Sequence, residues 1–461
     1  MIIQNFQHLI SNSRSTAESD ARRFMLELLD FGVKSVLPQN IISKSVKLIK
    51  ETLYIQNFKV KLSRIERIYV VGAGKASGAM AEVLEQILGS KITAGLINIP
   101  KGTRDRYKTH VIQLNEATHP IPSEPGVLGA QKIIELVKQA KTNDLIIALF
   151  SGGGSALLTY PVNSIPLDEF NSLNRALIKS GATIQEINTV RKHCSQIAGG
   201  RLAQYGKQAK IVTLILSDVI DGSADAIASG PTVPDPTTFH QAIEILEKYQ
   251  LWESTSLSIQ QYFQKGVKGT VPETPKPSNK IFRTTNAIKL GDIKLACESI
   301  KKYAHQKGFK SHIYSSGITG DAHVEGEKFL KFVKDRYIKG NRGKLKPIIL
   351  IGGGETTVKV TGSGKGGRCQ EIGLMLLSEF EQLSGIVFAA MGTDGIDGFS
   401  DAAGVIIDNY SAKLAEEKRL NSETFLNNND SYNFFKELGD CLIFTGPTGT
   451  NVNDLMLFGI F

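Results

Sequence analysis

Two cationic side chains stand beside glycine-rich runs, a pairing that favours the binding of an anion. Lys75 lies in the run GAGKAS (72–77), and Arg368 lies in GKGGRCQE (364–371). A lysine at a helix start is disfavoured by the helix dipole unless an anion lies nearby. The arginine guanidinium offers a planar donor fork that suits phosphate or carboxylate. The alternatives are a solvated helix start for Lys75 and a surface ion pair for Arg368.

Three aspartates occupy positions where a carboxylate can bind a metal ion or accept a proton. Asp218 follows the apolar run 211–216, and Asp394 and Asp397 form a D-x-x-D pattern among glycines. Carboxylate oxygens are preferred ligands of Mg²⁺, so we predict all three as metal ligands. The alternative for Asp218 is a helix or turn cap, and the alternative for Asp394 and Asp397 is a residue that closes an Asx turn.

Glycine-rich loops recur after apolar runs of strand length. The most glycine-rich one begins where IILI (348–351) runs into GGGETT (352–357). Glycine lets a ligand approach the backbone, and a loop that leads into a helix offers N–H groups to an anion. An ordinary turn is the alternative for any single loop. We expect six loops to wall one polar site, at residues 72–77, 151–156, 217–225, 352–357, 392–404 and 445–454.

These cations, acids and glycine loops are the parts that phosphoryl transfer requires, since its catalysis is mainly positioning and electrostatic stabilisation. We predict Lys75, Arg368 and Asp218 as catalytic residues. The predicted cofactor-binding residues are Gly74, Ser151, Gly152, Gly153, Gly154, Ser155, Gly353, Gly354, Glu355, Thr356 and Asn453.

Several familiar motifs fail when they are tested against the sequence. Neither glycine–lysine pair is followed by Ser or Thr, as a Walker A loop requires. A dinucleotide fingerprint needs glycine where Ser77 stands; a GxGxxxG variant survives, but the next strand end, INIPKG, offers no acid for a ribose. Ser151 and Ser155 lack the G-x-S-x-G pattern of a nucleophilic serine. We expect His119, before Pro120, only to fix a turn.

Length and composition are those of a globular protein. A chain of 461 residues exceeds one ordinary core, and it is 41% hydrophobic and 21% charged. The longest apolar runs fall far short of the ~20 residues of a membrane helix. The first 15 residues do not resemble a signal peptide. We therefore expect a cytoplasmic protein with no membrane partner.

The charge distribution indicates the class of ligand, and the cysteine spacing indicates the cellular compartment. The net charge is +9, but the densest basic run (328–346) has apolar residues at helical spacing, which favours a solvated helix face. We expect no nucleic-acid partner and an anionic small-molecule substrate. Four cysteines lie far apart, which argues against zinc and disulfides and suits a reducing compartment.

Alternating apolar runs and amphipathic stretches predict two α/β domains with a cleft between them. The Pro-rich segment TVPETPKPSNK (270–280) is the predicted linker and hinge. We assign residues 1–275 to the first domain and 281–461 to the second. Strands are predicted at 67–71, 94–99, 111–114, 144–150, 211–216, 313–314, 348–351, 386–390 and 441–444, and helices at 17–36, 124–141 and within 167–205.

The ordered set of motifs resembles the glycerate 2-kinase family with a C-terminal MOFRL domain (class II). The resemblance covers roughly residues 17–455. It implies a Rossmann-like N-terminal domain with a parallel sheet, and a smaller α/β MOFRL domain with a mixed sheet. The motifs are VVGAGKA, THPIPSEPG, LFSGGGSAL, INTVRKHCSQIAGGRLA, LSDVIDGSADAIASGPTVPDPTTF, LIGGGETTVKV, GKGGRCQE, GTDGIDGFSDAAG and TGPTGTNVNDL.

The resemblance also implies an activity. It implies phosphorylation of D-glycerate at the 2-hydroxyl by ATP with Mg²⁺, giving 2-phosphoglycerate, in an interdomain cleft. The essential lysine of the family falls on Lys75 and its arginine on Arg368. The implied partners are D-glycerate and the nucleotide, and we expect a monomer or homodimer.

The sequence departs from the family pattern at two places. Ile220-Asp221-Gly222 replaces the usual Pro-Gly-Asp, so an acid role there moves to Asp221 or is lost. Cys369 replaces the usual Asn.

Two other functions are alternatives to the implied kinase. One alternative is an NAD(P)H-dependent hydroxypyruvate reductase, which the missing ribose acid disfavours. The other is a non-catalytic sugar-acid binding protein, which the presence of both cations disfavours.

Overall fold

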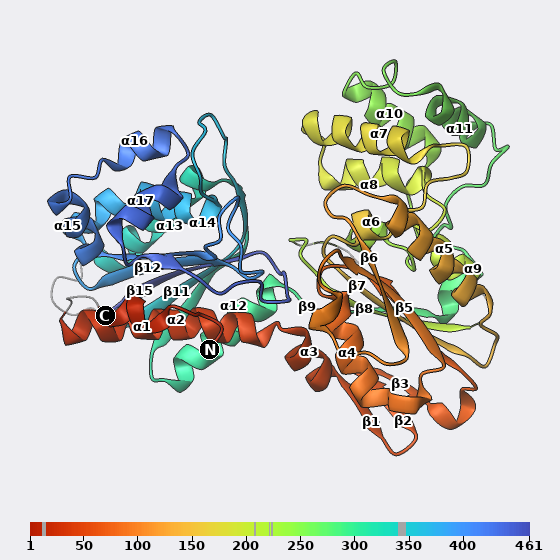
Figure 1. The fold of residues 1–461 in the computed structure, drawn as a ribbon, viewed down its shortest axis with the longest axis horizontal. Coiled ribbons are helices and arrows are strands. Elements are labelled where there is room, and N and C mark those ends of the chain that lie inside the picture. Colours follow the sequence, from red (N-terminus) through yellow and green to blue (C-terminus); the bar gives the residue numbers. More distant parts are fainter. Residues whose placement is uncertain (12–14, 207–208, 221, 223–224, 340–346) are drawn as a thin grey trace. The chain divides into compact units, whose positions relative to one another are not determined.

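The computed structural model describes residues 1–461 except 12–14, 207–208, 221, 223–224 and 340–346. The chain forms two compact units (Figure 1). We call Pro38–Leu290 the central unit, and Met1–Leu37 with Gly291–Phe461 the terminal unit. The sequence-based division differs, because it assigned residues 1–37 to the first domain and ended that domain at residue 275, before the change of unit at Gly291.

The central unit is built on a six-stranded sheet in the order β6-β5-β4-β7-β8-β9. Strands β4 to β8 are parallel, as the uninterrupted apolar runs predict for strands buried on both faces. The strands are β4 (Ile68–Ala73), β5 (Ala94–Pro100), β6 (Ile112–Ala117), β7 (Leu145–Ser151), β8 (Lys210–Leu216) and β9 (Thr285–Gly291).

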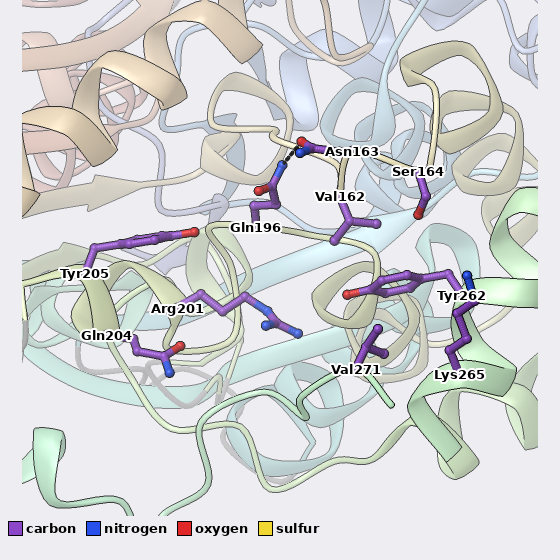
Figure 2. Close-up of a pocket in the computed structure, with 10 residues that line it drawn as sticks. All are labelled: Val162, Asn163, Ser164, Gln196, Arg201, Gln204, Tyr205, Tyr262, Lys265 and Val271. Carbon is purple, nitrogen blue, oxygen red and sulfur yellow. Dashed lines mark hydrogen bonds between the residues drawn. The ribbon is translucent and has the colours of Figure 1, made fainter. Parts of the chain in front are cut away.

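Helices cover this sheet and form a further layer beside it. Helices α5 and α9 share one core with the sheet, whereas α7, α8, α10 and α11 enclose a separate core around Phe239 and Phe263. A pocket of about 420 Å³ lies between α9 and α11 (Figure 2). A three-stranded antiparallel sheet of β1 (Val46–Ile49), β2 (Thr52–Ile55) and β3 (Phe58–Lys61) precedes β4. The helices are α3 (Pro38–Ser45), α4 (Ser77–Leu88), α5 (Glu124–Lys138), α6 (Gly154–Leu157), α7 (Leu167–Lys179), α8 (Ile184–His193), α9 (Arg201–Tyr205), α10 (Phe239–Lys248) and α11 (Leu257–Val267).

The Pro-rich segment 270–280 is part of the central unit and not the linker that its composition predicts. Glu273 accepts hydrogen bonds from the backbone N–H of Phe239, at 2.8 Å, and pairs with His193, at 3.0 Å. Thr274 is buried and donates to Asp235 at 2.9 Å. These side-chain bonds, which composition does not reveal, hold the segment against the helical layer.

The terminal unit contains a mixed sheet in the order β10-β11-β15-β12-β13-β14. Only β10 and β11 pair in parallel among the described residues; the other neighbours are antiparallel. Both predicted sheet types, parallel in the first half and mixed in the second, are therefore confirmed. The strands are β10 (Lys310–Asp321), β11 (Ile348–Thr357), β12 (Ile386–Gly392), β13 (Gly404–Asp408), β14 (Leu442–Ile443) and β15 (Asp454–Ile460).

Helices cover both faces of this sheet, and those from the chain's start lie with α12 on one face (Figure 1). Fully buried Arg22 of α2 explains why residues 1–37 belong here: it pairs with Asp408 at 3.4 Å and Asp440 at 3.7 Å. No helix in the described ranges is long and apolar enough to cross a bilayer. The helices are α1 (Phe6–Ser11), α2 (Thr16–Ser35), α12 (Ile293–Gln306), α13 (Ala322–Val333), α14 (Arg368–Leu376), α15 (Asn409–Glu417), α16 (Ser422–Asn427) and α17 (Ser431–Leu438).

Candidate active site

Lys75 lies on a tight turn between β4 and α4 that the neighbouring strand β7 holds in place. Its backbone N–H donates to the Gly152 carbonyl at 2.8 Å. The Ser151 hydroxyl accepts the Ala76 N–H at 3.0 Å and lies 3.1 Å from the Ser77 hydroxyl. Ser151 is buried, so its side chain supports the turn. Within the described ranges, the half-buried Lys75 ammonium forms no hydrogen bond or ion pair.

The glycines after β7 bring Asp218 and His119 close to Lys75. A β-carbon added at Gly152 would lie 1.9 Å from Asp218 Oδ2, so only glycine permits the carboxylate to approach the backbone here. At Gly153, which has a φ of 78°, an added β-carbon would lie 3.1 Å from His119 Nε2 and 3.2 Å from Lys75 Cγ. The ends of β4, β6, β7 and β8 therefore contribute to one cluster, as expected at the carboxyl edge of a parallel sheet.

His119 is a candidate that the sequence reasoning missed, because it assigned this residue only to a turn. Partial desolvation, together with the Lys75 cation, lowers the pKa of His119 to about 4, although the imidazole keeps an exposed edge. The ring is therefore neutral at pH 7. A neutral imidazole beside a lysine can donate and accept hydrogen bonds without adding positive charge.

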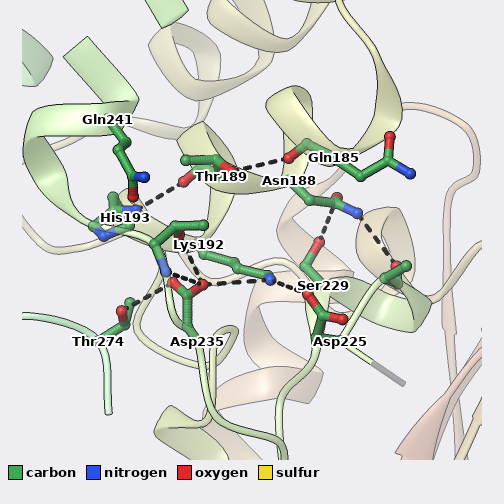
Figure 3. A network of polar contacts seen from close by, with 12 residues as sticks. Gln185, Asn188, Thr189, Lys192, His193, Asp225, Ser229, Asp235, Gln241 and Thr274 are labelled. Carbon is green, nitrogen blue, oxygen red and sulfur yellow. Dashed lines mark hydrogen bonds and ion pairs between the residues drawn. The ribbon is translucent and has the colours of Figure 1, made fainter. Parts of the chain in front are cut away.

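A polar network on α8 supports the loops behind this cluster (Figure 3). Ser155 lies 2.9 Å from Ser229, whose hydroxyl donates to Asn188 at 3.1 Å. Buried Lys192 pairs with Asp225 at 2.9 Å and with Asp235 at 3.5 Å. These partners fix both the loop after β7 and the one after β8.

The position of these supporting residues follows from two features of the sequence. Asn188 and Lys192 are four apart in INTVRKHC, a spacing that puts them on one face of a helix. The spacing was visible in the sequence, but their partners were not. The family departure at Asp221 lies outside the described residues, so its role stays a prediction.

In the terminal unit, residues 352–357 form the end of a strand and not the anion-binding loop that their glycine content predicts. They belong to β11 and pair with β10 and β15. A β-carbon at Gly353 would lie 2.6 Å from Ile293, and one at Gly354 would lie 2.0 Å from the Ile318 carbonyl. These two glycines are therefore explained by close packing of α12 and β10 against the strand. Thr356 is also buried, with its hydroxyl unpartnered within the described part of the chain.

Arg368 begins α14 and is held by two carboxylates. It forms a bidentate pair with Asp454 through Nε and Nη2, the second at 3.0 Å, and its Nη1 lies 2.9 Å from Glu355. Asp454 is buried, whereas the Arg368 side chain is 30% exposed. Burial raises the pKa of Asp454, and the paired Arg368 cation opposes that rise and favours the carboxylate. Burial alone would lower the pKa of Arg368, but the Asp454 partner raises it above its ordinary value. Arg368 therefore stays charged.

The D-x-x-D pair divides into two different environments. Asp397 is buried and accepts the backbone N–H groups of Cys369, at 3.1 Å, and Gln370, at 2.9 Å, together with the Gln370 amide. Burial raises the pKa of Asp397, and these hydrogen bonds oppose the rise. Asp397 therefore caps the N-terminus of α14 from outside that helix, a role that differs from the Asx turn left open in the sequence. Asp394 is half-buried and accepts the Ile396 N–H at 3.1 Å, an Asx-turn contact.

The donor chemistry of these aspartates allows a limited test of the magnesium prediction. No group of three or more His, Cys, Asp or Glu side chains suited to a metal occurs in the residues that the structure describes. Mg²⁺ commonly uses one or two carboxylates plus substrate phosphates, so Asp218 and Asp394 still fit. Asp397 fits poorly, because its oxygens already accept N–H groups.

The predicted site residues thus fall into two clusters, one in each unit. The central unit holds Gly74, Lys75, residues 151–155 and Asp218; the terminal unit holds Gly353–Thr356 of β11, Arg368, the two aspartates and Asn453. Asn453 is buried with a φ of 71°, and its carbonyl accepts the Thr393 N–H at 3.0 Å.

Comparisons with known proteins agree with this two-part organisation. A domain of unknown function (DUF4147) matches residues 24–264, and the MOFRL family matches residues 348–454. The chain is 37% identical to a D-glycerate 2-kinase from Thermotoga maritima, over 95% of this chain and 97% of that protein. A glycerate 2-kinase from Pyrococcus horikoshii is also 37% identical, with the same coverage.

Structural similarity and other relatives add to this result. The crystal structure of a glycerate kinase from Thermotoga maritima matches with a TM-score of 0.83 and 36% identity, covering 96% of this chain and all of that one. A protein from Agrobacterium vitis named a putative hydroxypyruvate reductase is 38% identical over 84% of this chain and 86% of its own length. Since the relatives named as kinases align over nearly their whole length and share the fold, the chain belongs to the glycerate 2-kinase family with a C-terminal MOFRL domain.

Proposed function

We propose that the protein transfers the terminal phosphoryl group of ATP to the 2-hydroxyl of D-glycerate. The observation that carries this proposal is the cluster at Gly152 and Gly153, where Lys75, Asp218 and His119 converge. A cation on a rigid turn stabilises the charge on a phosphoryl group in transfer. The family membership of the chain supports the same reaction class.

In this reaction the glycerate 2-oxygen bonds to the terminal phosphorus as the bond from that phosphorus to the leaving ADP oxygen breaks. Lys75 would stabilise the phosphoryl oxygens, and Asp218 would accept the proton of the hydroxyl. The glycine backbone after β7 lets the Asp218 carboxylate and the His119 ring lie close to Lys75. His119, neutral at pH 7, would orient the substrate by hydrogen bonding.

Mg²⁺ would be held by one carboxylate, Asp218 of the central unit or Asp394 of the terminal unit, together with phosphate oxygens of the nucleotide. When bound, it neutralises phosphate charge. Glu355 and Asp454 already neutralise Arg368, so its remaining N–H groups would grip a phosphate or the glycerate carboxylate. Removing Mg²⁺ with a chelator should abolish ADP release, and Mg²⁺ should restore it.

The proposal further requires that both units take part in one reaction, since Lys75 and Arg368 belong to different units. Closure on the substrate would exclude water that otherwise hydrolyses ATP. Small-angle scattering with nucleotide and D-glycerate should show a smaller radius of gyration than the free protein. An unchanged radius with both ligands bound would count against closure.

The decisive experiment incubates the purified chain with D-glycerate, ATP and Mg²⁺ and identifies the product isomer by ³¹P NMR. We expect 2-phosphoglycerate and one ADP per product molecule. Formation of 3-phosphoglycerate would contradict the assigned hydroxyl, and no phosphorylated product would contradict the kinase.

The second candidate is hydroxypyruvate reduction with NAD(P)H, which is favoured by the names of two relatives from Agrobacterium vitis. The sequence opposes it, since the strand end INIPKG offers no acid for a ribose. A parallel assay with hydroxypyruvate and NADH separates the two candidates. Oxidation of NADH without ADP release from D-glycerate would select the reductase.

A further inference from the structure

Among the described residues, the pocket between α9 and α11 is lined by two cations, Arg201 and Lys265, and by no acidic side chain. Arg201 extends into it from α9, and Lys265 comes from α11 (Figure 2). Its volume of about 420 Å³ is sufficient for a small metabolite. It shares no lining residue with the cluster around Lys75.

The guanidinium of Arg201 is the strongest sign that the pocket binds an anion. Its Nε and Nη2 atoms are buried and have no hydrogen-bond partner within the described residues. Buried cationic N–H groups are costly unless an acceptor satisfies them. In folded proteins, a buried arginine guanidinium normally has a carboxylate or a carbonyl oxygen beside it. Fully buried Arg22 has two carboxylates near its guanidinium, although its Nε and Nη1 also lack hydrogen-bond partners within the described residues. Arg201 differs in that no ion pair to a carboxylate is found for it among the described residues.

Two tyrosines add neutral donors around the same guanidinium. Burial raises the pKa of Tyr205 and of Tyr262, and the nearby Arg201 cation opposes that rise in both. Both phenols therefore keep their protons at pH 7 and can donate. In Figure 2 the hydroxyl of Tyr262 points toward Arg201 across the pocket.

The number of charges and donors indicates which anion fits. A phosphate monoester carries up to two negative charges and three terminal oxygens, which match two cations and two phenolic donors. A carboxylate has one charge and two oxygens, which would leave one cation unmatched. Val162 and Val271 supply apolar walls for a short carbon chain.

We propose that this pocket binds a small phosphate monoester, with its phosphate on Arg201 and its carbon chain between the two valines. The exposed Lys265 side chain, whose ammonium lies beyond Tyr262 in Figure 2, would turn toward the phosphate when the ligand binds. The site is separate from the reaction proposed for Lys75 and does not depend on it. Because its walls come from α9 and α11, an occupant would bridge the sheet layer and the helical layer of the central unit.

Calorimetric titration of the whole chain with glycerol 3-phosphate tests the proposal, with inorganic phosphate, malonate and glycerol as comparison ligands. We expect glycerol 3-phosphate to bind more tightly than malonate and glycerol not to bind. Arg201→Met should weaken binding by about tenfold or more, the scale of losing a charged hydrogen bond. Lys265→Gln should weaken it several-fold. The matched control is Lys268→Gln, an exposed lysine that ends the same helix outside the pocket.

Several outcomes would overturn the proposal. These are unchanged affinity in folded Arg201→Met, equal effects of Lys265→Gln and Lys268→Gln, or no binding of glycerol 3-phosphate at millimolar concentration. Malonate binding as tightly as glycerol 3-phosphate would reject the phosphate class. Loss of binding in Lys75→Met would assign the ligand to the Lys75 cluster. If Arg201→Met fails to fold by circular dichroism, the Lys265 and Lys268 pair decides the question.

Discussion

Lys75 and Arg368 look alike in the sequence, but the structure gives them opposite surroundings. Lys75 has no hydrogen-bonding or ionic partner within the described residues and lies beside a neutral His119. Arg368 is bound to Asp454 and Glu355. A cation without a counterion attracts an incoming anion with its full charge. The charge of a paired cation is largely offset by the protein's own carboxylates.

This difference assigns separate tasks to the two residues. Three of the five N–H groups of Arg368 are committed to carboxylates, so it is suited to hold a ligand in a fixed orientation. The charge of Lys75 remains available for the transition state. The largest catalytic effect is therefore expected at Lys75.

Replacing Lys75 by Met should lower kcat by about 10²-fold or more, the scale of one lost electrostatic donor. Affinity for D-glycerate should change less, because the interaction is strongest in the transition state. Steady-state ADP release measures both quantities. The matched control is Lys59→Met, on an exposed position of β3. A near-parental kcat in the Lys75 variant would reverse the comparison and leave Lys75 as a solvated helix-start residue.

Arg368→Lys and Asp454→Asn test whether Arg368 acts through its fixed geometry. Lysine cannot reproduce the planar fork, so we expect roughly a tenfold loss of kcat/KM. Asp454→Asn leaves the guanidinium without its buried partner and should cost about 2 kcal/mol of unfolding free energy, less than a fully buried pair because Arg368 is 30% exposed. Urea unfolding and kinetics on the same preparations separate the two effects. Parental kinetics in Arg368→Lys would show that the fork is dispensable.

Asp218→Asn and Asp397→Asn form a matched pair, one carboxylate in each cluster. Asp218→Asn should raise the Mg²⁺ concentration needed for half-maximal activity if Asp218 holds the ion, and should lower kcat if it accepts the hydroxyl proton. Asp397→Asn should lower the unfolding free energy by about 1 kcal/mol, as for a lost cap, and leave the Mg²⁺ dependence unchanged. Activity measured against Mg²⁺ concentration tests the first effect, and urea unfolding tests the second. A shifted Mg²⁺ dependence in Asp397→Asn alone would restore that residue as a ligand.

The smallest expected effect is the response of His119 to its lysine neighbour. Its pKa of about 4 in the folded chain lies below its ordinary value of 6.5. Its contribution to stability is therefore present above pH 6.5 and is lost as the pH falls through 4. His119→Asn should lose less stability over that interval. In Lys75→Met, the pKa measured by NMR should rise only partway, because desolvation is the larger cause. A parental pKa near 6.5 would contradict the placement of His119.

The local secondary structure was predictable from residue spacing. The apolar runs that became β7 and β8, and the amphipathic pattern that became α2, are determined by side chains close together in the sequence. Glycines after strands also indicated the Lys75 turn correctly. Such features depend on backbone preference and on the burial of one face or both. A short stretch of sequence is enough to indicate each of these.

The same short-range signals misplaced two segments. Residues 352–357 looked like a loop, but pairing with β10 and β15 extends the strand through them. Residues 270–280 looked like a linker, but Glu273 and Thr274 bind partners elsewhere in the central unit. In both cases long-range contacts overruled local composition.

The sequence by itself determined the order of strands and helices, the glycine turns and the types of residue available for chemistry. Only the tertiary structure decided which charges are neutralised. The Arg368 and Asp454 partners lie 86 residues apart in the chain, and the His119 that faces Lys75 comes from another strand end. Electrostatic environment depends on distance and burial in space, and no spacing along the chain specifies either.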